Sequence, residues 1–159
     1  MNAVSMEMPS ERSSAFRAIL FGGLLAGILD LTAACVTNYW VSPLRIFQAI
    51  ASGLLGAESF GGGVWAAALG VLLHFFIAFS ATAVYYAASR QWKFLVNQAV
   101  VYGILYGAAV YWFMQLVVLP LSAFKGANGF TLGQILTGSL VHILCVGLPI
   151  ALVVRRFSK

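Results

Sequence analysis

The sequence has very little charge. Only 8% of its 159 residues are Asp, Glu, Lys or Arg, whereas 62% are hydrophobic, and the mean hydropathy is +0.95. A soluble domain usually carries about 25% charged residues, which water solvates at its surface. This chain lacks enough charged groups to cover itself in that way, which excludes an ordinary soluble globular protein. We therefore expect a membrane domain whose solvent is the lipid bilayer.

The sequence also lacks the marks of several functional classes. Its net charge of +5 is not gathered into basic clusters interleaved with aromatic residues, so we expect no nucleic-acid partner. Its two cysteines, Cys35 and Cys145, both fall inside apolar runs, which excludes a secreted disulfide framework. There is no nucleophile motif, no phosphate-binding glycine loop and no second core carboxylate for acid–base catalysis. We therefore predict no catalytic residues and no enzymatic activity.

Four apolar runs are long enough to cross a bilayer as helices, which requires roughly 20 residues each. They cover residues 18–39, 64–89, 94–119 and 132–154. The sequence thus predicts an all-α membrane protein with a polar, cytoplasmic N-terminal segment over residues 1–15. A single four-helix transmembrane domain follows over residues 16–157.

The basic residues predict the orientation of these spans. If both termini are cytoplasmic, two basic residues lie outside, Arg45 and Lys125, and seven lie inside: Arg12, Arg17, Arg90, Lys93, Arg155, Arg156 and Lys159. Cytoplasmic loops carry the excess of Lys and Arg in membrane proteins. We therefore expect a multi-pass protein with both termini in the cytoplasm.

The loop after the first span is too apolar to be a free linker. Ser42 can cap a helix that has Pro43 at its first position, and Gly56 can end it. The sequence predicts a short helix over residues 43–55. It lies in the outer interface or, as the alternative, enters the membrane as a re-entrant segment.

Two short motifs recur in the same order. The first and third spans each contain a GxxxG pair, and the second and fourth each contain a GxxxH pair. The residues are Gly23 and Gly27, Gly103 and Gly107, Gly70 and His74, and Gly138 and His142. We predict two copies of one helical hairpin. Because lipid provides no hydrophobic drive between helices, the six glycines are expected to let the helices approach closely.

Helical spacing separates two faces of the second span. Small residues and His74 lie on one face, which is expected to be buried. The other face carries four large apolar residues that we expect to contact lipid: Leu72, Phe75, Phe76 and Phe79.

Three polar residues lie at matching depths. Asp30, His74 and His142 are each ten residues from the outer end of their span, which places them roughly 15 Å deep. Each lies on the small-residue face of its helix. We predict a polar core near the middle of the membrane that contains these three side chains.

Several roles for that core are open from the sequence. The side chains could hydrogen-bond across helices and fix the packing in a purely structural or interaction protein. They could form a titratable core for proton-coupled transport or permeation, because histidine titrates near neutral pH. His74 and His142 could ligate a haem, or all three residues could bind a metal ion, in a redox subunit.

Permeation of a small solute or of protons is the function that we favour, and it requires no cofactor. Four spans form only a thin pathway. We therefore expect a homo-oligomer or a membrane partner, in addition to the lipid bilayer.

The sequence also resembles a group of known proteins, and the resemblance rests on the stretches "AGILDLTAA", "SPLRIFQAIASGLLG" and "LHFFIAFSATAVYY". From about Phe16 to Phe157, the chain resembles a group of small four-span bacterial inner-membrane proteins. The resemblance implies that architecture and location. The group has no assigned activity, so no site residue follows from it.

The orientation gives a direct prediction. A periplasm-active alkaline phosphatase fused at Lys125 should be active in cells, because the loop between the third and fourth spans is expected outside. A fusion after Arg90 should be inactive and serves as the control. The reverse pattern would invert the topology.

Overall fold

The protein is helical throughout the part that the structure describes. The computed structural model describes residues 9–124 and 131–158, and these residues contain no β-strand. Four helical stretches are long and apolar enough to cross a membrane: Ser13–Thr37, Gly63–Gln91, Ala99–Leu121 and Leu132–Phe157. The prediction of an all-α, four-span protein is confirmed. Residues 1–8 of the predicted polar segment, Lys125 and Lys159 lie outside the described residues.

The first half of the chain forms α1 (Pro9–Thr37), α2 (Pro43–Leu55), a short 3-10 turn η1 (Gly56–Gly61) and α3 (Gly63–Gln91). The second half forms α4 (Phe94–Asn97), α5 (Ala99–Phe113), η2 (Met114–Val118), α6 (Leu119–Leu121), α7 (Leu132–Val141), η3 (His142–Gly147) and α8 (Leu148–Phe157). Both η2 and η3 are π-helical.

The third span begins later than the sequence predicts. We expected it to start at Phe94, but Gln98 has non-helical backbone angles (φ −114°, ψ 47°) and separates the single turn of α4 from α5. The long helix therefore starts at Ala99. The first span ends at Thr37, two residues before the expected end at Tyr39.

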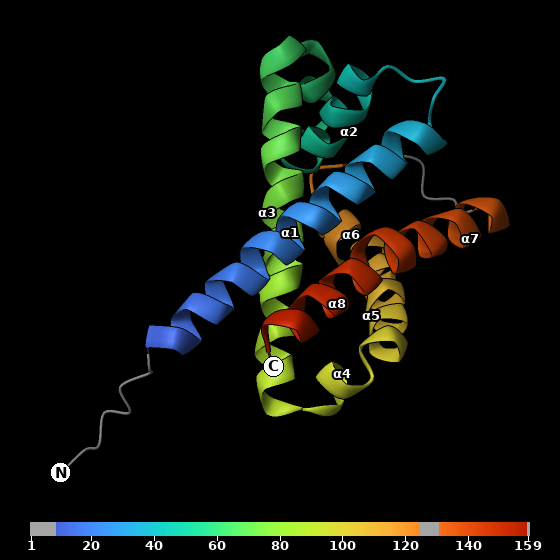
Figure 1. Cartoon of the computed structure of the whole chain (residues 1–159). Helices are drawn as coiled ribbons and strands as arrows, with labels where there is room; N and C mark the ends of the chain where they lie inside the picture. Colours follow the sequence, from blue (N-terminus) through green and yellow to red (C-terminus); the bar gives the residue numbers. More distant parts are fainter. Residues whose placement is uncertain (1–8, 125–130, 159) are drawn as a thin grey trace.

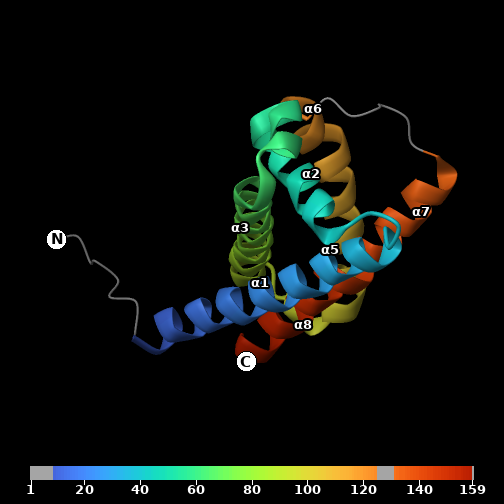
Figure 2. The same cartoon turned by 90° about the horizontal axis from the view of Figure 1, so that it is seen from above.

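The long helices form two layers. α1 and the continuous helix α7–η3–α8 lie side by side, and both are steeply inclined to α3 and α5 (Figures 1 and 2). α2 lies between α3 and α5, toward the C-terminal end of α1 (Figures 1 and 2).

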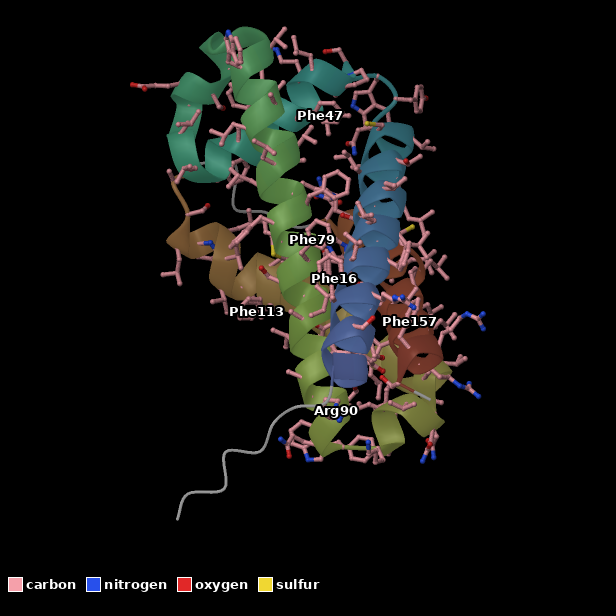
Figure 3. All side chains as sticks on the ribbon, turned by 60° about the vertical axis from the view of Figure 1, so that its left-hand side comes forward. Phe16, Phe47, Phe79, Arg90, Phe113 and Phe157 are labelled. Carbon is pink, nitrogen blue, oxygen red and sulfur yellow. The ribbon has the colours of Figure 1, made fainter. Side chains whose placement is uncertain are left out.

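The two ends of the helical domain differ. At one end, the Ser14 hydroxyl donates a hydrogen bond to the Phe157 carbonyl, and the Phe21 and Phe157 rings stack 5.8 Å apart. Arg90 lies toward the same end, and Phe47 of α2 lies toward the other (Figure 3). We call these the terminal end and the α2 end.

α2 has the bounds that the sequence predicts. The Ser42 side chain accepts a hydrogen bond from the Arg45 amide, and Gly56 ends the helix with a positive φ of 63°. A Cβ at Gly70 would overlap the Phe47 carbonyl oxygen of α2. Gly70 lies seven residues into α3, about 10 Å from its start. α2 therefore packs beside the first turns of α3 rather than across its end.

The GxxxG pair of α1 receives aromatic rings. Cβ atoms at Gly27 and Gly23 would collide with the rings of Phe75 and Phe79 from α3. These two phenylalanines are therefore half-buried rather than wholly on the lipid side, because the glycines leave a groove that the rings enter. Leu72 and Phe76 on the same helix are exposed, as predicted: Leu72 is 68% exposed and Phe76 69%.

The GxxxG pair of α5 makes a different contact. A Cβ at Gly107 would lie 2.6 Å from the Ile143 Cα, and a Cβ at Gly103 would lie 3.1 Å from the Gly147 carbonyl oxygen. Gly147, at the end of η3, meets both glycines backbone to backbone. The fourth helix therefore contacts α5 through Gly147, a glycine that belongs to neither the GxxxG nor the GxxxH motifs. The two-hairpin repeat stays a prediction.

The close contact at Gly147 is testable. Gly147→Ala should lower the unfolding free energy by about 1–3 kcal/mol, because the methyl group has no room against the α5 backbone. Gly133→Ala is the matched control, since a Cβ there meets nothing within 4 Å. The measurement is thermal unfolding in detergent, followed by tryptophan fluorescence. Equal melting temperatures for the two variants would contradict the packing.

Candidate functional site

The three polar residues singled out from the sequence line one cavity. It has a volume of about 380 Å³ and is bounded by α1, α2, α3, α5, η2, α6 and η3. α1 contributes Asp30, α3 contributes His74, and His142 begins η3. Val110, which would be the counterpart of Asp30 under the predicted repeat, lines the same cavity. Residues more than 100 positions apart in the sequence are thus brought together.

The remaining wall of this cavity is almost entirely apolar. α2 contributes Ile46 and Ile50, and η2 contributes Met114 and Val118. Apart from Asp30, His74 and His142, Ser122 supplies the only polar side chain among the described residues of the wall. Sequence reasoning missed the part played by α2 and η2. The apolar residues of α2 were the available signal, but they did not show which helices they face.

Both histidines are held by backbone carbonyl groups. Nε2 of His74 lies 2.9 Å from the Gly27 carbonyl oxygen of α1, and Nδ1 of His142 lies 2.9 Å from the Gly138 carbonyl oxygen of its own helix. Because a carbonyl oxygen can only accept, these two nitrogens carry the protons. In the neutral rings, Nδ1 of His74 and Nε2 of His142 therefore remain as acceptors.

Asp30, unlike the two histidines, forms no hydrogen bond and no ion pair with any residue of the described ranges. A charged side chain at the centre of a membrane helix costs roughly 2.5–3.5 kcal/mol on insertion scales. Such a carboxylate needs a proton, water or a cation to offset that cost.

A second hollow reaches Asp30 from the α2 end. This crevice, of about 490 Å³, lies between α1 and α7 and shares Asp30, Ala34 and His142 with the wall of the cavity. Its wall is more polar than that of the cavity, since it includes Thr37, Asn38, Thr131, Gln134 and Thr137. Asp30 and His142 therefore lie where a polar crevice and an apolar cavity meet.

Two tyrosines lie beside the cavity wall. The Tyr106 hydroxyl donates a hydrogen bond of 2.7 Å to the carbonyl oxygen of Ala81, a residue of that wall. The Tyr85 ring packs on Tyr106 with centroids 4.9 Å apart. These contacts tie α5 to α3 next to the cavity.

Two π-helical segments border the cavity, and each precedes a proline. η2 ends two residues before Pro120, and η3, which begins at His142, ends two residues before Pro149. Proline lacks the amide hydrogen that would continue the α-helical pattern. π segments of this kind are frequent at functional sites. The π segment before Pro149 begins at His142.

A three-ligand metal site is not formed. Within residues 9–124 and 131–158, no three His, Cys, Asp or Glu side chains are grouped closely enough to hold one ion. The metal alternative with Asp30, His74 and His142 therefore gains no support from the described residues, and it stays a prediction. The two rings also leave different nitrogens free, which does not favour a matched pair of haem ligands.

Comparison with known proteins adds no assignment. No protein-family model, curated protein or solved structure matches the chain.

The crevice predicts which buried positions water reaches. With both native cysteines replaced by serine, Ala34→Cys in proteoliposomes should react with a membrane-impermeant methanethiosulfonate, because Ala34 lines the crevice. Ala18→Cys on the same helix is the matched control and should not react, since Ala18 is fully buried. Mass spectrometry measures the modified fraction. Equal modification at both positions would rule out a crevice that selectively exposes Ala34.

Proposed function

We propose that the chain is a non-enzymatic protein of the bacterial inner membrane, with both termini cytoplasmic, that lets protons or a small solute cross the bilayer. One observation carries the proposal. Three titratable side chains from three helices line a single cavity, and two of them also line a polar crevice. Ionisable groups within membrane spans frequently mark such pathways.

The arrangement of donors and acceptors suits proton transfer. Asp30 is free of protein partners, and each neutral imidazole keeps one nitrogen that can accept a proton. Water in the crevice would reach Asp30 and His142 first. His74 also lines the cavity and is linked to α1 through Gly27. A proton or solute that enters through the crevice would therefore meet these three side chains.

Passage across the whole domain would also require a change of conformation. The π segments η2 and η3 border the cavity and are natural places for such a bend, because their backbone hydrogen bonds are already irregular. A bend there could break the hydrogen bond from Tyr106 to Ala81 beside the cavity.

A purely structural role explains the histidines better than it explains Asp30. The hydrogen bond from His74 to Gly27 ties α3 to α1, and interhelical bonds of this kind are worth about 0.6 kcal/mol on average. Asp30 makes no such contact, although it bears the larger cost of burial. The unpartnered carboxylate therefore favours permeation over packing.

We further propose that the protein works as a homo-oligomer or with a membrane partner. Large apolar side chains remain exposed on all four long helices, among them Phe21, Leu72, Leu105 and Leu140. Lipid or neighbouring membrane helices can cover these surfaces.

The test is proton flux in proteoliposomes that contain a pH-sensitive dye, driven by a potassium diffusion potential. Asp30→Asn should reduce flux at least five-fold, toward the rate of protein-free vesicles, because it removes the charge but preserves the shape. Glu58→Gln is the matched control, since Glu58 lies in η1 and lines neither hollow. Flux that is equal in the wild type and Asp30→Asn would overturn the proposal.

A further inference from the structure

We infer that the cavity takes a small apolar organic cation, which competes with protons for Asp30. The inference rests on the proposed function and names the class of solute that the same site would carry.

The charge of the site selects a cation. Its wall contains one carboxylate and two imidazoles whose free nitrogens accept hydrogen bonds. In the part of the chain that the structure describes, no Lys or Arg lines the cavity or the crevice. An anion would find no positive partner there. A cation would instead form an ion pair with the Asp30 carboxylate, which has no ion-pair partner among the described residues.

The apolar wall selects an organic cation over a hydrated inorganic one. A metal ion that entered would lose its water without gaining a set of ligands, because the His, Cys, Asp and Glu side chains of the described ranges form no three-residue group. An organic cation has an apolar body. That body can pack against Ile46, Ile50, Ile77 and Val146 of the cavity wall.

The volume of the cavity and the residues of the crevice also fit a small organic cation. A volume of about 380 Å³ is at the lower end of the range for small-molecule pockets, roughly 300–1,000 Å³, so the solute is small. Trp40 lines the crevice that leads to Asp30. Tryptophan attracts organic cations more strongly than the other aromatic side chains do.

Competition with protons follows from the groups around Asp30. His74 of α3 and His142 of η3 line the same cavity, and Cys145 of η3 interacts with Asp30 electrostatically. Protonation of Asp30 removes the negative charge that a cation needs, and protonation of either histidine adds a repelling positive charge. Both changes weaken cation binding as the pH falls. A proton and the cation would therefore occupy the site alternately.

The experiment is equilibrium dialysis of the detergent-purified full chain, with a detergent-only blank. The probe is benzyltrimethylammonium, and benzenesulfonate is an anion of similar size. We expect saturable binding of the cation, no binding of the anion, and affinity at least five-fold weaker at pH 5.5 than at pH 8. Asp30→Asn should weaken cation binding at least ten-fold, whereas Glu58→Gln should not change it.

The outcomes separate the two proposals. Absent or unsaturable cation binding, or equal binding of the anion, would overturn the solute class, and Asp30-dependent proton flux would still support permeation. Saturable, Asp30-dependent binding without any flux would support the cation site and overturn permeation. The ligand pair and the pH dependence use the wild-type protein, so the inference stays testable even if Asp30→Asn does not fold.

Discussion

Close contact between helices at glycine is the constraint on which the rest of the structure depends. Lipid provides no hydrophobic force that would press helices together, so packing and polar contacts must do so. α1 receives two phenylalanine rings of α3 at Gly23 and Gly27, and α5 meets η3 backbone to backbone at Gly147. These contacts lie mainly in the half of the domain that contains the buried core. Toward the α2 end the long helices separate, and α2 fills only part of the space.

The cavity is a consequence of that separation. The inclined pair α1 and α7–η3–α8 crosses the upright pair α3 and α5 (Figure 2). The cavity of about 380 Å³ lies among these helices and α2, and Asp30, His74 and His142 border it. This cavity and its unpaired carboxylate are the features on which the proposed permeation rests.

Much of this arrangement could be predicted, and the errors have physical causes. Depth along each span indicated that Asp30, His74 and His142 lie at one level, because the helical rise is constant. The same counting assigned Phe75 and Phe79 to lipid, since it gives the face of a helix but not the shape of its neighbour. Gly147 was overlooked because it belongs to no motif. The hydrogen bonds of the two imidazoles to the carbonyl groups of Gly27 and Gly138 were not foreseen, because residue spacing does not show hydrogen bonds of that kind.

The amino-acid sequence by itself determined the four spans, the helical class and the short helix from Pro43 to Leu55. Length, hydropathy and capping are local properties of the chain, and a bilayer enforces them strictly. Only the tertiary structure decided which helices touch, which glycines meet rings or backbone, and which hollows reach Asp30. These features depend on the angles at which the helices cross, and small residues permit many such angles. The two imidazoles illustrate the division: their depth could be read from the sequence, but their hydrogen-bond partners could not.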